Sequence, residues 1–280
     1  MSQVVPDLPL ASSLAKNIAM VEDLFLYKSD IVKRTFTMGG KGGRNGVLFF
    51  VEGMVDQPAV ARYILEPLLC AKPEELPETP QEIAENILLY PSIQRVHRLN
   101  DLSRELLGGN CVVLFEGAAE GLLIDSRKWE RRSVNEPATE KVVRGPREGF
   151  VETLRVNRVL LRRKLPHPNL VMEDLKVGRL TLTTVTVAYI AGVAREDLIQ
   201  EVKERIQRIE VDAILDSGQI EQFIEDSPYS PFATVANSEK PDKVAGKLLE
   251  GRVAIMVDGS PIVLTVPQLF SESFQSAEDQ

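Results

Sequence analysis

The spacing of apolar residues along the chain predicts an alternation of helices and strands. Leu14, Ile18, Val21 and Phe25 recur at intervals of three and four residues, so we expect a helix over residues 12–27. A glycine-rich turn over residues 38–46 separates two apolar runs and indicates a hairpin. The other elements expected in this half are strands over residues 31–37, 47–51, 111–115 and 122–124, and helices over residues 58–69, 81–88 and 92–107.

The same order of elements recurs after residue 149. Asp258-Gly259 is a strong signal for a tight hairpin turn between the last two strands. The elements expected in this half are helices over residues 150–164, 196–208, 217–224 and 242–249, strands over residues 170–177, 180–190, 253–257 and 262–266, and a short strand over residues 211–215. The pattern predicts an α/β (α+β) fold with two similar subdomains, each a small mixed sheet with helices, joined by a connector.

Individual residues support this repetition. Residues 49–53 align with residues 188–192 at an offset of 139, and residues 111–117 align with residues 253–259 at an offset of 142. We interpret the halves as related units; the alternative is two unrelated units that share a generic strand–glycine–helix order. The expected organisation is a first subdomain over residues 1–125, a connector over 126–148, a second subdomain over 149–270 and a tail over 271–280.

Composition narrows the class of protein. The chain has 280 residues and a formal net charge of −8, which argues against a general nucleic-acid binder. Its two cysteines, Cys70 and Cys111, suggest neither a disulfide framework nor a zinc site and favour a reducing compartment. We expect no secretory signal at the start, and no apolar window reaches the ~18 residues that a membrane span needs. A soluble chain is expected, which is compatible with a soluble piece of a membrane protein.

The loop over residues 39–46 is the main candidate for a phosphate site. It carries Lys41 and Arg44 among five glycines. However, it lacks the Gly-Lys-Ser/Thr ending of a P-loop and the last glycine of the dinucleotide motif, and it joins two strands. Both motifs need a strand that leads into a helix, whose first N–H groups bind the anion. We expect a mobile hairpin tip; the alternative is a basic tip that contacts lipid phosphates or an acidic neighbour.

Signals for catalysis are weak. His97 is expected within the helix over residues 92–107 and His167 within a turn between two prolines, and neither has a cysteine or histidine at metal-ligand spacing. No Gly-x-Ser-x-Gly nucleophile elbow is present. We therefore expect no catalytic residue, no cofactor and no metal, and a chain that is not an enzyme.

The segment from residue 136 to residue 164 is the most distinctive part of the chain. Its helical part places Arg155, Arg158 and Arg162 on one face, with Glu152 within reach of Arg155. One interpretation is a solvated helix with internal ion pairs; the other is a cationic face that binds an acidic partner or anionic headgroups. The residues singled out as signature and interface candidates are Glu136, Pro137, Thr139, Glu140, Arg144, Gly145, Pro146, Arg147, Glu148, Gly149 and Phe150.

This segment resembles the GerA family of spore germination receptors, whose members carry a Glu-Pro-x-Thr-Glu…Val-x-Arg-Gly-Pro-Arg-Glu-Gly-Phe block. The block is matched by residues 136–137, 139–140 and 143–150. Further matches include residues 92–94, residues 189–190 with Gly192, and the hairpin over residues 258–261. The resemblance runs from about residue 31 to residue 270, which is nearly the whole chain.

The resemblance implies the amino-terminal domain of an A subunit, at the cytoplasmic face of the spore inner membrane. Such a domain would act in signal transduction and subunit assembly during nutrient-triggered germination. The implied partners are the receptor B and C subunits, other A subunits, possibly a small-molecule germinant, and the membrane through a carboxyl-terminal region absent from this chain. The alternative is an α/β enzyme or a binding protein for a phosphorylated small molecule that uses the loop over residues 39–46.

Overall fold

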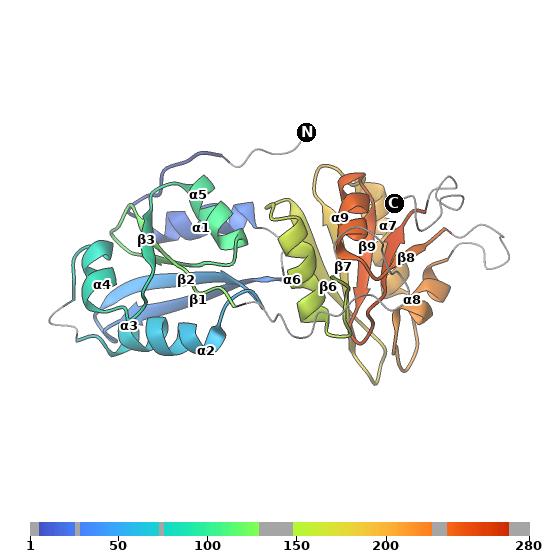
Figure 1. Cartoon of the computed structure of the whole chain (residues 1–280), viewed down its shortest axis with the longest axis horizontal. Helices are drawn as coiled ribbons and strands as arrows, with labels where there is room; N and C mark the ends of the chain where they lie inside the picture. Colours follow the sequence, from blue (N-terminus) through green and yellow to red (C-terminus); the bar gives the residue numbers. More distant parts are fainter. Residues whose placement is uncertain (1–5, 26–28, 73–75, 129–147, 226–233, 269–280) are drawn as a thin grey trace. The chain divides into compact units, whose positions relative to one another are not determined.

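The computed structural model describes residues 6–25, 29–72, 76–128, 148–225 and 234–268. These residues fall into two compact units (Figure 1). The amino-terminal lobe comprises residues 6–128 with residues 166–168, and the carboxyl-terminal lobe comprises residues 148–165 and 169–268. Each lobe is described by itself below.

The amino-terminal lobe is built on a five-stranded sheet. Figure 1 shows α1 (Leu14–Leu24) and α5 (Leu99–Leu107) on one face of this sheet. The other face is covered by α2 (Gln57–Val60), the π-helical turn η1 (Ala61–Leu65) and α3 (Glu66–Cys70), with α4 (Pro80–Asn86) beside them. The strands lie in the order β1-β2-β4-β5-β3, and they are β1 (Ile31–Met38), β2 (Arg44–Val51), β3 (Ile93–Val96), β4 (Cys111–Phe115) and β5 (Gly121–Ile124).

The carboxyl-terminal lobe has a second five-stranded sheet. Helices α6 (Leu154–Lys164) and α9 (Pro241–Leu249) bury apolar side chains against one face, and α7 (Glu196–Gln207) and α8 (Ser217–Ile224) against the other. Alternate residues of each strand feed the two cores, as the pleat requires. The strands lie in the order β6-β7-β9-β10-β8, and they are β6 (Leu170–Val177), β7 (Thr183–Ile190), β8 (Ala236–Ser238), β9 (Val253–Val257) and β10 (Val263–Val266).

The two lobes share one topology. The order β1-β2-β4-β5-β3 becomes β6-β7-β9-β10-β8 when each strand is replaced by its counterpart five places on. The register agrees as well, because Ile31 pairs with Val51 in one lobe and Leu170 pairs with Ile190 in the other, again at an offset of 139. The predicted α/β fold with two similar subdomains is therefore confirmed.

The lobes also share a buried asparagine in the first turn of the first helix of each lobe, Asn17 in α1 and Asn157 in α6. The Asn17 side chain accepts a hydrogen bond from the Ala11 N–H (2.8 Å) and donates one to the Ala11 carbonyl (2.7 Å). Asn157 makes the same pair of bonds with Val151, at 2.8 and 2.6 Å. We call each arrangement an asparagine hook. It folds the six residues that precede each asparagine into a fixed entry to the helix.

A carboxylate from the sheet completes each helix entry. The Leu14 N–H donates to the Glu116 carboxylate at 3.2 Å, and the Leu154 N–H donates to the Asp258 carboxylate at the same distance. Both acidic residues follow the corresponding strands β4 and β9. A negative group is favourable there because the first N–H groups of a helix have no partner within it.

Several expected elements differ from those observed. The helix expected over residues 92–107 is two elements, because Ile93–Val96 pairs with β5 as an edge strand before α5 begins. The expected strand over residues 211–215 is absent, since the Val211 and Asp212 carbonyls bind N–H groups of the β6–β7 turn. The sheets were expected to be mixed, whereas every strand pairing among the described residues is antiparallel. Strand β8 was missed because three residues give too short a pattern.

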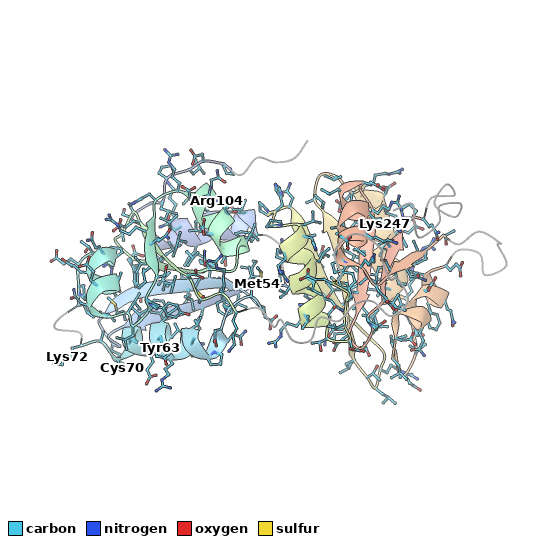
Figure 2. The ribbon with its side chains drawn as sticks, viewed as in Figure 1. Met54, Tyr63, Cys70, Lys72, Arg104 and Lys247 are labelled. Atoms are coloured by element: carbon cyan, nitrogen blue, oxygen red, sulfur yellow. The ribbon has the colours of Figure 1, made fainter. Side chains whose placement is uncertain are left out.

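The two cysteines have contrasting environments. Cys70 is exposed at the surface of the amino-terminal lobe, where Figure 2 labels it at the end of α3. Cys111 is fully buried in β4 and accepts a hydrogen bond from the Ser126 hydroxyl at 3.0 Å. Burial raises the pKa of the Cys111 thiol to about 12 and outweighs the opposite effect of that hydrogen bond.

We predict that replacing Asn157 by Ala destabilises the carboxyl-terminal lobe by about 2 kcal/mol, because the Val151 N–H and carbonyl both lose a buried partner. Urea titration of the purified chain measures the free energy of unfolding. Asn237→Ala, at an exposed position of β8, is the matched control and is expected to change it by less than ~0.5 kcal/mol. Equal effects of the two substitutions would contradict the role of the hook.

We predict that a thiol reagent modifies Cys70 and leaves Cys111 unmodified in the folded chain at pH 8. Only the thiolate reacts, and a thiol with a pKa of about 12 has almost none at that pH. Because burial raises the folded-state pKa, the contribution of this thiol to stability is present below pH ~9 and is lost as the pH rises towards 12. Mass spectrometry after short labelling gives the number of labelled cysteines per chain. The Cys70→Ser variant is expected to take up no label until it is unfolded.

Candidate functional site: the start of the carboxyl-terminal lobe

The structure places only the last three of the signature residues. Glu148, Gly149 and Phe150 lead into the asparagine hook of the carboxyl-terminal lobe. The other candidates lie outside the described residues, namely Glu136, Pro137, Thr139, Glu140, Arg144, Gly145, Pro146 and Arg147. Their predicted role stays a prediction.

Phe150 and Glu148 fasten the chain at the point where it enters this lobe. The Phe150 ring is buried in the core formed with α6 and α9, and the Phe150 N–H donates to the Glu239 carbonyl at 2.7 Å. The Glu148 carboxylate lies 3.3 Å from Arg163 and 3.6 Å from Lys164, both in the last turn of α6. Backbone, core and surface contacts therefore hold the same three residues.

Helix α6 buries two of the three arginines that were expected to share a cationic face. Arg162 is fully buried and donates to the Leu170 carbonyl at 3.1 Å. Arg158 is buried against the sheet. The interpretation of this face as an exposed docking surface for acidic partners is wrong for Arg158 and Arg162, because both guanidinium groups are directed into their own lobe.

Arg158 forms a closed polar cluster with β6 and β7. Its Nη2 donates to both oxygens of the Asp174 carboxylate, at 2.6 and 2.7 Å, and its Nε donates to the Thr186 hydroxyl at 3.2 Å. The Thr186 hydroxyl in turn donates to Asp174 at 2.7 Å. Each of the three side chains is thus hydrogen-bonded to the other two. These directional bonds hold α6 in position over the sheet, in addition to its apolar contacts.

The amino-terminal lobe has no counterpart of this cluster. At the equivalent positions it carries Ile18 in α1, Thr35 in β1 and Val47 in β2. The first lobe therefore forms the same topology without an ionic cluster at this place, and the cluster is a property of the second lobe alone. Sequence reasoning did not find it, because the arginine spacing says which residues share a helix face but not what that face contacts.

The glycine-rich loop is less available for phosphate than its sequence suggests. Arg44 donates to the Glu116 carbonyl at 2.6 Å and to the Glu78 carbonyl at 2.8 Å, and its guanidinium lies 5.8 Å from the centre of the Phe115 ring. Burial lowers the pKa of Arg44, and Glu116 partly offsets this. Arg44 therefore serves the fold of the amino-terminal lobe, and Lys41 is the remaining basic residue of the loop.

His97 lies between β3 and α5 instead of within a helix, 3.6 Å from the Glu120 carboxylate. No group of three histidine, cysteine or acidic side chains among the described residues could hold a metal ion. Across the same residues, no helix combines the length and the hydropathy that a membrane span needs.

The described part of the carboxyl-terminal lobe contains a cavity of about 200 Å³ that the sequence did not reveal. Apolar side chains of α7, α8 and β10 form its wall, including Leu198, Val202, Ile224 and Val266. Arg205 also lines this cavity and donates to the Ile224 carbonyl at 2.6 Å and to the Glu201 carboxylate at 2.6 Å. The remaining wall residues are Thr234, Val235, Pro267 and Gln268.

Known proteins resemble this chain over almost its whole length. It is 38% identical over 270 residues to spore germination protein KA of Bacillus subtilis, covering 96% of this chain and 50% of that protein. It is 32% identical to spore germination protein GerLA of Bacillus cereus, covering 97% of this chain and 55% of that protein. The chain therefore spans about half the length of these curated relatives.

A solved structure shows the same fold. The N-terminal domain of the A subunit of the Bacillus megaterium spore germinant receptor GerK3 matches with a TM-score of 0.75 and 32% identity, over 95% of this chain and 98% of that one. The family model described as Bacillus/Clostridium GerA spore germination protein matches residues 19–280. The resemblance of residues 136–150 to the GerA signature thus extends over both lobes, and the chain belongs to the GerA family of spore germination proteins.

Proposed function

We propose that this chain is the amino-terminal domain of the A subunit of a nutrient germinant receptor, and that it acts in signal transduction and subunit assembly without catalysis. The observation that carries the proposal is the match over 98% of the GerK3 A-subunit N-terminal domain and 95% of this chain. The proposed location is the cytoplasmic face of the spore inner membrane. The proposed partners are the B and C subunits, other A subunits and a nutrient germinant.

The construction of the second lobe supports a role in transmission. Phe150 and Glu148 tie the incoming chain to α6, and the Arg158–Asp174–Thr186 cluster ties α6 to the sheet. A displacement of the segment that carries the signature would therefore act on the whole lobe, because rigid, directional contacts do not deform gradually. The alternative of an enzyme or binding protein for a phosphorylated ligand has less support, since Arg44 is held by two carbonyl groups.

We predict that Arg147→Glu in the whole receptor slows nutrient-triggered germination by more than ~tenfold, as charge reversal at a subunit contact commonly does. The fall in optical density of a spore suspension after nutrient addition measures germination, and co-purification with the other subunits measures assembly. Arg208→Glu, at the exposed residue that directly follows α7, is the matched control. Normal germination and assembly with Arg147→Glu, in a receptor present at normal level, would contradict the proposed interface.

The first lobe supplies a test of the ionic cluster. Arg158→Ile alone removes the hydrogen bonds of the guanidinium to the Asp174 carboxylate, and we expect a loss of about 2 kcal/mol in the free energy of unfolding. The triple variant Arg158→Ile, Asp174→Thr and Thr186→Val carries the residues of the first lobe and is expected to regain most of that loss.

The germination rate of the triple variant then distinguishes a role of the cluster in stability from a role in signalling. If the cluster serves transmission, the triple variant folds and assembles but still germinates slowly in the whole receptor. Full recovery of germination by the triple variant would restrict the cluster to a role in folding.

A further inference from the structure

The two lobes share the turn that follows their second strand. Gly53 and Gly192 lie at equivalent places in this turn and have positive φ angles of +79° and +80°. The next residue closes the turn by donating its N–H to the carbonyl three residues earlier, at 3.2 Å for Met54 and 3.1 Å for Val193. The turn therefore presents equivalent backbone groups in each lobe.

In the first lobe, the chain that leaves the sheet pairs with this turn. Residues 126–128 follow β5 and run antiparallel to residues 54–56. The Asp56 N–H donates to a carbonyl of this segment at 2.9 Å, and the Met54 carbonyl accepts from one of its N–H groups at 3.0 Å. We call residues 126–128 the exit strand. It satisfies two backbone groups that the sheet itself leaves open.

The exit strand also covers the turn that precedes β4. A Cβ at Gly109 in that turn would lie 3.2 Å from the Arg127 side chain and 3.3 Å from the Met54 side chain, so both pack against this glycine. Met54, labelled in Figure 2, is only 1% exposed, and so is Leu107, two residues before the glycine. Large apolar side chains at this end of the first lobe are therefore buried.

The second lobe leaves the equivalent positions open. The Val193 carbonyl and the Arg195 N–H correspond to the two bonded groups of the first lobe, and neither has a hydrogen-bond partner in the described part of the chain. Val193 is 42% exposed, and Leu249, the counterpart of Leu107, is 61% exposed. Both border the turn before β9, since a Cβ at Gly251 would lie 3.0 Å from the Val193 carbonyl.

The chain itself continues from this end of the sheet. The Asp125 N–H donates to the carbonyl of the residue before β3 at 3.2 Å. Pro267 stands at the equivalent place after β10 and has no N–H, so Gln268 makes the equivalent bond, at 2.9 Å, to a carbonyl before β8. The register is therefore one residue later in the second lobe, and residues 269–271 correspond to residues 126–128.

We propose that residues 269–271, which lie outside the described residues, form the exit strand of the second lobe and pair with residues 193–195. In the register of the first lobe, the Arg195 N–H and the Val193 carbonyl each gain a backbone partner. The Phe270 side chain takes the place of the arginine stem of the first lobe and covers the turn before β9.

The side chains of each segment match the surface that it meets. In the first lobe the exit strand is charged, and the Lys128 ammonium lies 2.8 Å from the Asp56 carboxylate. In the second lobe residues 269–270 are Leu and Phe, and the surface offers Val193 and Leu249, both exposed. Burial of apolar area contributes about 25 cal/mol per Å². This agreement favours the chain's own segment as the occupant.

A paired exit strand gives the second lobe a fixed point of departure, as residues 126–128 give the first. The pairing belongs to the 280-residue chain itself and does not depend on the proposed function. In the proposed receptor, it would let a movement of the second lobe act directly on the part of the protein that follows.

Engineered disulfides test the register of the proposed strand. Ala194 lies opposite Phe270 in this pairing, as Val55 lies opposite Arg127 in the first lobe. Residues opposite each other in a pair without mutual hydrogen bonds have Cα atoms about 4.5 Å apart, which a disulfide can span. In a Cys70→Ser background, Ala194→Cys with Phe270→Cys is expected to oxidise at least about tenfold faster than Ala194→Cys with Phe274→Cys, the matched control. Mass spectrometry without reduction measures the oxidised fraction.

Hydrogen exchange gives a second measurement that needs no substitution in the folded lobe. Deletion of residues 269–280 is expected to raise the exchange rate of the Arg195 amide at least about tenfold, because the carbonyl that it binds is removed. Deletion of residues 273–280 alone, the matched control, is expected to leave this rate unchanged.

Two outcomes overturn the proposal. Equal rates of disulfide formation at positions 270 and 274 would show that the segment has no fixed register on the lobe. An Arg195 amide that exchanges equally fast with and without residues 269–280 would show that the segment supplies no partner. Both measurements use the isolated chain, so their failure leaves the germination tests untouched.

Discussion

Each lobe depends on how its chain enters the first helix. A segment that precedes a helix has no ladder partner for its backbone groups, and burying these groups unpaired is unfavourable. The hooks of Asn17 and Asn157 meet this requirement, since one amide side chain satisfies both an N–H and a carbonyl six residues earlier. With the entry fixed, the helix lies where the carboxylate that follows the central strand can bind its first N–H groups.

The two lobes share this helix entry but differ in the side chains between the first helix and the sheet. In the first lobe α1 buries apolar residues such as Leu14 and Val21, whereas in the second lobe Arg158 of α6 reaches across to Asp174. The Arg158 side chain is 10% exposed and the Asp174 side chain 31%, and ion pairs that are partly or fully buried contribute geometry more reliably than net stability. The two lobes therefore keep one topology while only the second gives its helix a defined orientation through charge.

Much of the architecture could be predicted from the sequence, because it follows local rules. Strand runs such as 111–115 and 253–257, and the glycines that follow them, gave both the α/β class and the repeat offsets that the registers now match. The helix expected over residues 92–107 failed because a four-residue edge strand has no periodicity of its own, and only its pairing with β5 defines it.

The site was harder to predict for a related reason. The role of Asn157 could not be predicted, because an asparagine in a helix carries no sign of the backbone groups that it binds six residues earlier. Arg158 and Arg162 were placed correctly on one face, but burial of that face is decided by residues of β6 and β7. Sequence spacing identifies the residues that share a helix face, but only tertiary contacts determine whether that face is buried and what it contacts.

The Arg158 cluster has a consequence for folding fidelity. Two lobes with one topology and one register in a single chain are prone to exchange equivalent elements during folding, as repeat proteins do. If α6 were to pack on the first sheet, its arginine would face Thr35 and Val47 and would have no carboxylate partner there. The reverse exchange would set Ile18 against the Asp174 carboxylate. The polar difference between the two equivalent helices thus favours the packing of each helix on the sheet of its own lobe.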